Sequence, residues 1–236
     1  MIVRRAIVAF VCVMSAALAA CSPSPPASVA TAKGSSATTE TTLSTTDRLM
    51  AEARNFAYRV RNVDCSATGS SFAISQGIVT NRHVASGAQS LQISTWSGTD
   101  FNATVQSISQ TPGADLAIAV GGPSTTTAVL GHRKVAPGTP VWAAGYPEGD
   151  QLSLTPGIVA DYIDGGIYGS PGQIMELTNA VKPGSSGSPL LDSVGKVVGV
   201  VFALNTVTGN ALAIPTSTLD QFLASPGNNA AGSCDG

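Results

Sequence analysis

The chain has few charged and aromatic residues, only two histidines and only four cysteines. Charged residues make up 11% of the sequence and aromatic residues 5%. The 12 Lys and Arg residues form no basic cluster or stripe, so a nucleic acid is a poor candidate as partner. The His, Cys and acidic residues are not clustered either, which argues against a structural metal site. We therefore expect neither a bound metal nor a nucleic-acid partner.

The longest apolar run lies at the N-terminus. Two arginines precede 6-AIVAFVCVMSAALAA-20, which is shorter than the roughly twenty residues of a membrane-spanning helix. Its end, 18-LAAC-21, resembles a bacterial lipobox, in which the cysteine becomes the acylated first residue. We expect residues 1–20 to be a lipoprotein signal peptide and Cys21 to anchor the exported protein to the outer face of the cell membrane. An ordinary cleavage with Cys21 incidental is the alternative.

The cysteine count then predicts one disulfide. Cys12 leaves with the signal peptide and Cys21 takes the lipid, so Cys65 and Cys234 remain. Export places both in an oxidising compartment, where such a pair usually forms a disulfide. Two free thiols are the alternative.

The mature chain changes character twice. Residues 21–46 are rich in Ser, Thr, Pro and Ala, so they bury too little surface to fold and are predicted to be a disordered tether. Residues 47–63 are predicted to form a helix, with Ser44 or Thr46 available as its cap. The apolar residues that recur there at helical spacing are Leu49, Ala53, Phe56 and Val60.

The remainder, residues 64–236, reads as one β-rich domain. Short runs rich in Val and Ile are bounded by Gly, Pro, Asn, Asp or Ser, which predicts an all-β barrel or sandwich. A last helix is predicted at 216–224, capped by Thr216 or Ser217. The predicted strands are 72–75, 77–81, 90–94, 102–109, 116–120, 140–146, 157–163, 173–178, 189–192, 196–204 and 211–215.

Three residues have the chemistry of a serine hydrolase. His83 follows an apolar strand, whereas His132 lies in a polar, turn-rich stretch typical of a solvated histidine. Asp115 precedes another apolar strand and fits a carboxylate that orients the imidazole. Each has a plainer interpretation, His83 as a core histidine and Asp115 as a turn cap.

The nucleophile candidate is Ser186, in 182-KPGSSGSPL-190. Gly184 and Gly187 leave the backbone around Ser186 open to a substrate. The N–H groups of Gly184 and Ser186 are suited to bind a developing oxyanion.

The following segments, in this order, resemble the trypsin-like serine proteases of chymotrypsin fold, nearest to the bacterial high-temperature-requirement and actinobacterial envelope proteases. They are 69-GSSF-72, 79-VTNRHV-84, 114-ADLAIAV-120, 141-VWAAGYPEG-149, 155-TPGIVA-160, 177-LTNAVKPGSSGSPLLD-192, 196-KVVGVV-201 and 211-ALAIPTSTL-219. The chain order His, Asp, Ser also matches this fold and differs from that of the α/β-hydrolases.

The resemblance implies two six-stranded antiparallel β-barrels, flanked here by a short N-terminal helix and a C-terminal helix. It implies a catalytic triad of His83, Asp115 and Ser186, an oxyanion hole made by Gly184 and Ser186, and no cofactor. Its substrates would be peptides or proteins. Ala180 and Val181 stand at the specificity pocket, which disfavours cleavage after Arg or Lys and favours a small or medium apolar residue.

The chain departs from the family pattern at two positions. Ser185 replaces the Asn or Asp that usually precedes the nucleophile, so activation by a new N-terminus paired with that Asp is excluded. Ser188 replaces a Gly and adds a side chain beside the nucleophile loop. The residues after Ala224 are too few for the PDZ module of the nearest branch, so a monomer is expected over a regulated trimer.

Two other functions therefore stay open. A pseudoprotease or envelope binding lipoprotein would keep the fold with little or no activity. A serine esterase would use the same chemistry on a different substrate.

Overall fold

The computed structural model describes residues 43–109, 113–122, 126–227 and 233–234. The chain divides into two units, Met1–Thr41 and Thr42–Gly236. The predicted signal peptide, Cys21 and nearly all of the tether lie outside the described residues. Within the described part of the chain, no helix is long and apolar enough to cross a membrane.

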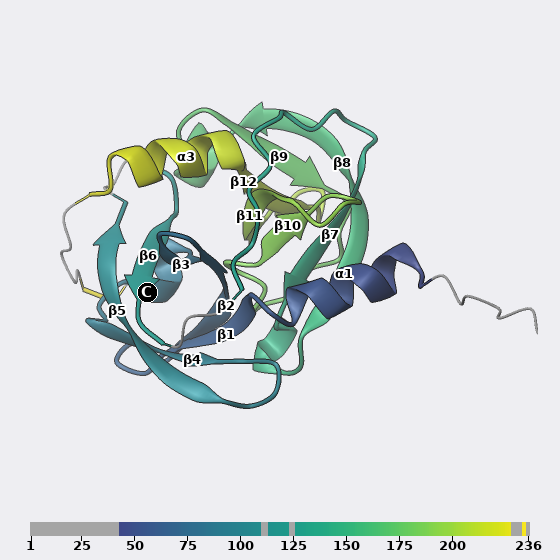
Figure 1. The fold of residues 1–236 in the computed structure, drawn as a ribbon. Helices are drawn as coiled ribbons and strands as arrows, with labels where there is room; N and C mark the ends of the chain where they lie inside the picture. The colour runs from purple at the N-terminus through teal and green to yellow at the C-terminus, as the bar shows by residue number, and fades with distance from the viewer. Residues whose placement is uncertain (1–42, 110–112, 123–125, 228–232, 235–236) are drawn as a thin grey trace, which may run out of the picture. The chain divides into compact units, whose positions relative to one another are not determined.

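The first half of the second unit forms a closed barrel of antiparallel strands, drawn in blue and teal in Figure 1. Its strands are hydrogen-bonded in the order β1-β2-β3-β6-β5-β4, and β1 also pairs with β4 to close the barrel. Their bounds are β1 Ala57–Asn62, β2 Ala67–Ile74, β3 Gly77–Thr80, β4 Ser90–Ser94, β5 Asp100–Ile108 and β6 Ala117–Val120.

The second half forms another closed barrel, drawn in green and yellow, with the order β10-β11-β12-β9-β8-β7 (Figure 1). Its strands are β7 Pro140–Gly145, β8 Ser153–Asp164, β9 Gln173–Leu177, β10 Pro189–Leu191, β11 Val197–Leu204 and β12 Ala211–Pro215. The two six-stranded antiparallel barrels confirm the fold expected from the resemblance.

Helices are few and short among the described residues. They are α1 Thr45–Ala53, α2 Arg82–Ala85 and α3 Thr216–Ala224, with 3-10 turns η1 Pro147–Gly149 and η2 Gly166–Tyr168. Ser44 caps α1 as predicted, because its hydroxyl accepts the Asp47 N–H at 3.2 Å. The predicted cap of α3 was wrong: Pro215 is at the cap position, and the Thr216 hydroxyl donates to Gly131 O instead.

The helix predicted over residues 47–63 was wrong in its second half. The helix ends at Ala53, and residues 57–62 form strand β1. The segment 58-YRVRN-62 alternates in burial, with Arg59 and Arg61 less buried than their neighbours, which is the period of a strand. The helical spacing of Phe56 and Val60 coincided with this alternation and concealed it. β1 completes the first barrel. The other eleven strands each overlap a predicted one, but β2 begins at Ala67 and not at residue 72, and β8 begins at Ser153 and not at residue 157.

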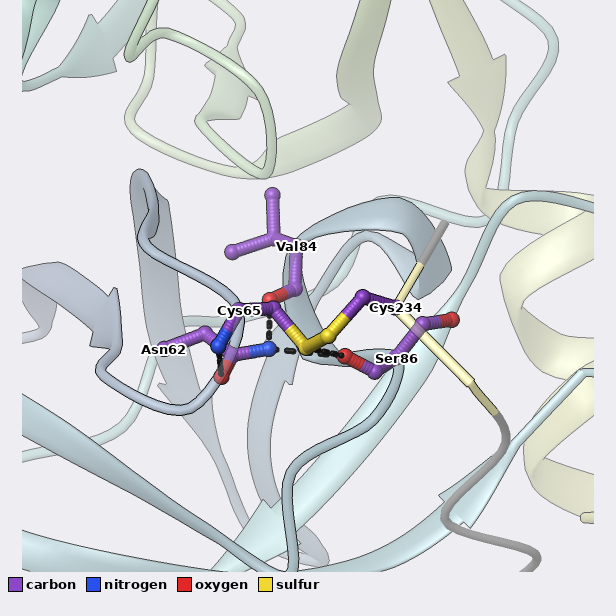
Figure 2. Close-up of a disulfide and its surroundings, with 5 residues drawn as sticks. All are labelled: Asn62, Cys65, Val84, Ser86 and Cys234. Carbon is purple, nitrogen blue, oxygen red and sulfur yellow. Dashed lines mark hydrogen bonds between the residues drawn. A yellow bond between two sulfur atoms is a disulfide. The ribbon is translucent and has the colours of Figure 1, made fainter. Parts of the chain in front are cut away.

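The disulfide between Cys65 and Cys234 is formed, which confirms the predicted pair (Figure 2). It joins the turn after β1 to the C-terminal segment across 169 residues of sequence. The bond lies against Gly87, where a Cβ would come within 2.4 Å of Cys65 Sγ. Because Gly87 follows α2 closely, the disulfide lies beside the helical turn that contains His83.

Candidate active site

His83 and Asp115 are brought together by the pairing of β3 with β6. Thr80 lies opposite Ala117 in this pair, so the residues after β3 meet those before β6. Asp115 Oδ2 lies 2.6 Å from His83 Nδ1, and Asp115 Oδ1 accepts the His83 backbone N–H at 3.0 Å. Both carboxylate oxygens of Asp115 therefore contact His83, which fixes the orientation of the imidazole. Because Nδ1 faces Asp115, Nε2 is the ring nitrogen that remains for another partner.

The carboxylate is shielded while the imidazole is accessible. The Asp115 side chain is 10% exposed and the His83 side chain 39% exposed. Asn81, fully buried, donates its side-chain amide to Asp115 O at 2.7 Å and so fixes the backbone of this residue as well. A shielded carboxylate beside an accessible imidazole is suited to orient a general base.

A buried asparagine on β1 holds the helical turn that contains His83. The Asn62 side-chain amide donates to Val84 O at 3.0 Å and to Ser86 O at 2.8 Å, as Figure 2 shows. Its Oδ1 accepts the Cys65 N–H at 3.1 Å. One side chain therefore connects the disulfide-bearing turn to α2.

Ser186 belongs to the loop before β10, in the second barrel, but it is fastened to the first. The Ser70 N–H, on β2, donates to Ser186 O at 2.7 Å. A Cβ on Gly69 would lie 2.8 Å from Val84 Cγ2 and 2.9 Å from Ser186 O, so Gly69 lets the two segments approach. Among the described residues no hydrogen bond joins Ser186 to His83, and such bonds commonly tighten only when substrate binds.

The loop before Ser186 orients the Gly184 N–H. The Pro183 carbonyl accepts the Glu148 N–H at 2.6 Å, from η1. In a trans peptide the N–H points away from the carbonyl, so the Gly184 N–H points away from Glu148. Gly184 has φ +89°, and a Cβ there would lie 2.6 Å from Tyr146 O, so only glycine fits this position.

The two departures from the family pattern fit into this loop. Ser185 is buried, donates its N–H to Lys182 O at 3.0 Å and accepts the Lys182 N–H on its hydroxyl at 3.4 Å. Ser188 is fully buried, and its hydroxyl has no hydrogen-bond partner among the described residues. Gly145 provides the space, since a Cβ there would lie 1.9 Å from Ser188 Oγ.

The other candidate residues make no hydrogen bond to His83 or Asp115 in the described part of the chain. Ala180 is exposed, and Val181 is partly buried against the core of the second barrel. His132, with its side chain 68% exposed, is an exposed histidine as predicted, and its Nδ1 lies 2.9 Å from Asp220 Oδ2. Its acidic partner, Asp220, is on α3, so His132 has a different carboxylate partner from His83.

Sequence reasoning missed the residues that support the loop of Ser186: Ser70, Gly145 and Glu148. All three fall inside the quoted family segments, so their positions were visible but their contacts were not. Glu148 has a positive φ of 60°, which is uncommon for a residue other than glycine. The sequence offers no signal for that conformation.

Two closed barrels, an accessible histidine paired with a shielded aspartate, and a serine in a glycine-containing loop define the class of the chymotrypsin-like peptidases. Residues 67–200 match the model of the family described as Trypsin-like peptidase domain. The chain belongs to this family.

Its relatives and structural neighbours include proteases of the HtrA type. Serine protease HTRA3 of Mus musculus is 34% identical over 179 residues, covering 70% of this chain and 38% of that protein. Serine protease HTRA1B of Danio rerio is 31% identical over 167 residues, covering 67% of this chain and 34% of that protein. The chain thus spans little more than a third of these relatives.

Solved structures share the fold. The active form of the Rv3671c protease from M. tuberculosis superposes with a TM-score of 0.66 and 24% identity, over 80% of this chain and 89% of that one. The HtrA-type protease AlgW with tripeptide gives a TM-score of 0.67 and 22% identity, over 76% of this chain and 62% of that one. At these identities the likeness concerns the fold alone.

Proposed function

We propose that this protein is an exported, lipid-anchored serine endopeptidase that acts through His83, Asp115 and Ser186. The observation that carries the proposal is the double contact of Asp115 with His83, at 2.6 Å to Nδ1 and 3.0 Å to the backbone N–H. This contact leaves Nε2 of an accessible imidazole as the proton acceptor. Membership of the trypsin-like peptidase family supports the same assignment.

The chemistry follows from these groups. The Ser186 hydroxyl attacks the carbonyl carbon of a peptide bond while His83 Nε2 takes its proton, and Asp115 stabilises the imidazolium. The N–H groups of Gly184 and Ser186 bind the resulting oxyanion. His83 then gives the proton to the leaving amine, and water releases the acyl group from Ser186 by the reverse steps. This scheme uses no metal and no cofactor.

The proposed substrate is a peptide or protein with a small or medium apolar residue at the cleavage site. Ala180 and Val181 motivate this preference, because they place no charge where a partner for Arg or Lys would be needed. Relatives that carry the name serine protease support peptide hydrolysis over ester hydrolysis.

Profiling of cleavage tests this activity. The mature protein should cleave peptides in a mixed library after Val, Ala or similar residues, and Ser186→Ala and His83→Ala should each abolish cleavage. Hydrolysis of simple esters without peptide cleavage would make the protein an esterase. No turnover of either kind in a folded, oxidised sample would make it a pseudoprotease.

The proposed location rests on the sequence of the first 21 residues. A basic start, an apolar run and 18-LAAC-21 support export and acylation of Cys21, and we propose a monomer held at the outer face of the cell membrane. Metabolic labelling with a palmitate analogue should mark the wild-type protein and not Cys21→Ala. Equal labelling of both would contradict the anchor.

A further inference from the structure

The orientation of the peptide between Pro183 and Gly184 decides whether the candidate oxyanion hole has one donor or two. Glycine allows this peptide to rotate easily, because Gly184 has no Cβ and has φ +89°. If it rotated by half a turn, the Pro183 carbonyl would replace the Gly184 N–H in the hole. Something must therefore hold the peptide.

The position before the nucleophile is poorly equipped for this task. Ser185 carries no charge, and its hydroxyl accepts the Lys182 N–H at a long 3.4 Å. Lys182 and Glu148 form an ion pair at 3.1 Å, but both side chains are more than half exposed, so this contact is weak.

Ser70 makes two contacts that are shorter and inside the protein. Its hydroxyl donates to Gly184 O at 2.8 Å and accepts the Tyr146 N–H at 2.9 Å. A serine hydroxyl can donate only one hydrogen, and here the Gly184 carbonyl receives it. The hydroxyl thereby ties the residue that provides the oxyanion donor to the turn that contains Tyr146.

The same turn holds the preceding carbonyl. Glu148, two residues after Tyr146, donates its N–H to Pro183 O at 2.6 Å. Arg59 on β1 fixes the end of the turn by donating to Gly149 O at 3.0 Å. Both carbonyls that flank the Gly184 N–H are thus connected to one anchored turn, and the Ser70 hydroxyl is the side chain that makes the connection on the Gly184 side.

Ser70 also contacts the nucleophile itself. Its backbone N–H donates to Ser186 O at 2.7 Å, and its own carbonyl accepts the Thr80 hydroxyl at 2.8 Å. Residues 70 and 186 therefore keep a fixed separation through the backbone, while the side chain of Ser70 holds the Gly184 carbonyl, on the far side of Gly184 from the peptide that Glu148 holds. Removing the hydroxyl leaves the backbone contact in place.

We propose that Ser70 is a positioning residue that holds the Gly184 N–H in the oxyanion hole, in place of the carboxylate that this chain lacks before its nucleophile. The inference rests on the proposed peptidase activity and assigns Ser70 no direct contact with substrate. It makes the hydroxyl important for the chemical step and unimportant for substrate binding.

The test compares Ser70→Ala with Ser71→Ala. Ser71 is the next residue on β2 and is equally buried, but its hydroxyl donates to Tyr58 O at 3.5 Å. Within the described residues its side chain makes no hydrogen bond to the loop of Ser186. The measurements are kcat and KM on a peptide p-nitroanilide with Val at the cleavage position, the rate of labelling by a fluorophosphonate, and the melting temperature of each variant.

Loss of one oxyanion donor lowers kcat by roughly 100- to 1,000-fold, and a donor that is merely released should cost less, about 10- to 100-fold. We expect that loss in kcat and in labelling rate for Ser70→Ala, with KM almost unchanged. Ser71→Ala should keep kcat within about threefold of the wild type, as expected of a group that does not act in the transition state.

Equal kcat values for the two variants would overturn the assignment of Ser70, as would losses that only follow the fall in melting temperature. If Ser70→Ala does not fold, Ser70→Gly gives the same comparison, and a wild-type kcat there would also overturn it. An inactive, unlabelled wild type would overturn the peptidase proposal together with this one. An active wild type with an equally active Ser70→Ala variant would overturn only the role of Ser70, so the two failures can be told apart.

Discussion

Replacing Gly145 by Ala should destabilise the protein through one identifiable contact. A Cβ at this position would lie 1.9 Å from Ser188 Oγ, 3.0 Å from Ser188 Cβ and 2.9 Å from Ser70 Oγ. The backbone of Gly145 is in a strand and lacks a positive φ, so strain in φ does not contribute. Overpacking of a core costs about 1–3 kcal/mol, and the 1.9 Å contact places this case near 3 kcal/mol.

A second substitution should relieve that cost. Ser188→Gly removes both Ser188 atoms from the contact, leaving the 2.9 Å approach to Ser70 Oγ. Ser188→Gly alone should be neutral to stabilising, by up to about 2 kcal/mol. It removes a hydroxyl that is buried without a partner among the described residues, worth about 1–3 kcal/mol, and adds backbone freedom that costs about 0.5–1 kcal/mol. In the double mutant we expect recovery of about 2 kcal/mol, a coupling typical of residues in contact.

Urea unfolding of the four proteins, followed by circular dichroism, measures this coupling. For a domain of this size, about 3 kcal/mol corresponds to a fall in melting temperature of about 6–12 °C for Gly145→Ala. Ser188→Ala added to Gly145→Ala removes the hydroxyl but keeps the Cβ of residue 188, so it should restore only part of the lost free energy of unfolding. If the double mutant is no more stable than Gly145→Ala, the contact with Ser188 is not the cause and the reasoning fails.

Two further perturbations test the surroundings of His83. Asn62→Ala should lower the free energy of unfolding by about 2–3 kcal/mol and reduce activity, because it removes the side-chain amide that donates to Val84 O and Ser86 O. Urea unfolding measures this loss, with Asn102→Ala, at an exposed position, as the control. Equal losses for the two variants would contradict the prediction. Reduction of the disulfide, which closes a 169-residue separation, should cost up to about 5 kcal/mol in the chain-entropy model. A melting temperature unchanged by reductant, or two thiols titrating in the native protein, would rule that out, and Cys65→Ser with Cys234→Ser serves as the insensitive control.

Most of the fold was accessible from the sequence because its strands are short, rich in Val and Ile, and separated by turn residues. The failure at β1 has a specific cause. Phe56 and Val60 are four residues apart, which is close to one turn of a helix. Four is also an even spacing, which places both residues on the buried side of the segment that becomes β1, so the same spacing fits a helix and a strand. The strand forms because Val60 pairs with Gly69 and with Ile93. Such pairing between distant residues cannot be predicted from the local sequence.

The candidate site was accessible for a different reason. With two histidines in the chain, the choice of His83 followed from its setting at the end of an apolar strand, and the structure places Asp115 against it. The supporting contacts could not be predicted, because Ser70, Tyr146 and Gly184 lie far apart in sequence and meet only where the two barrels touch. The same holds for Gly145 and Ser188, whose fit depends on the space between the end of β7 and the loop before β10.

The central claim is that Ser186 is a nucleophile activated by His83 and Asp115. Its most direct test is a fluorophosphonate probe applied to the folded, oxidised mature protein, followed by mass spectrometry of the labelled peptide. We expect a single adduct on Ser186, absent from Ser186→Ala and formed much more slowly in His83→Ala and Asp115→Asn. An unlabelled wild type, or an adduct that persists in Ser186→Ala, would contradict it.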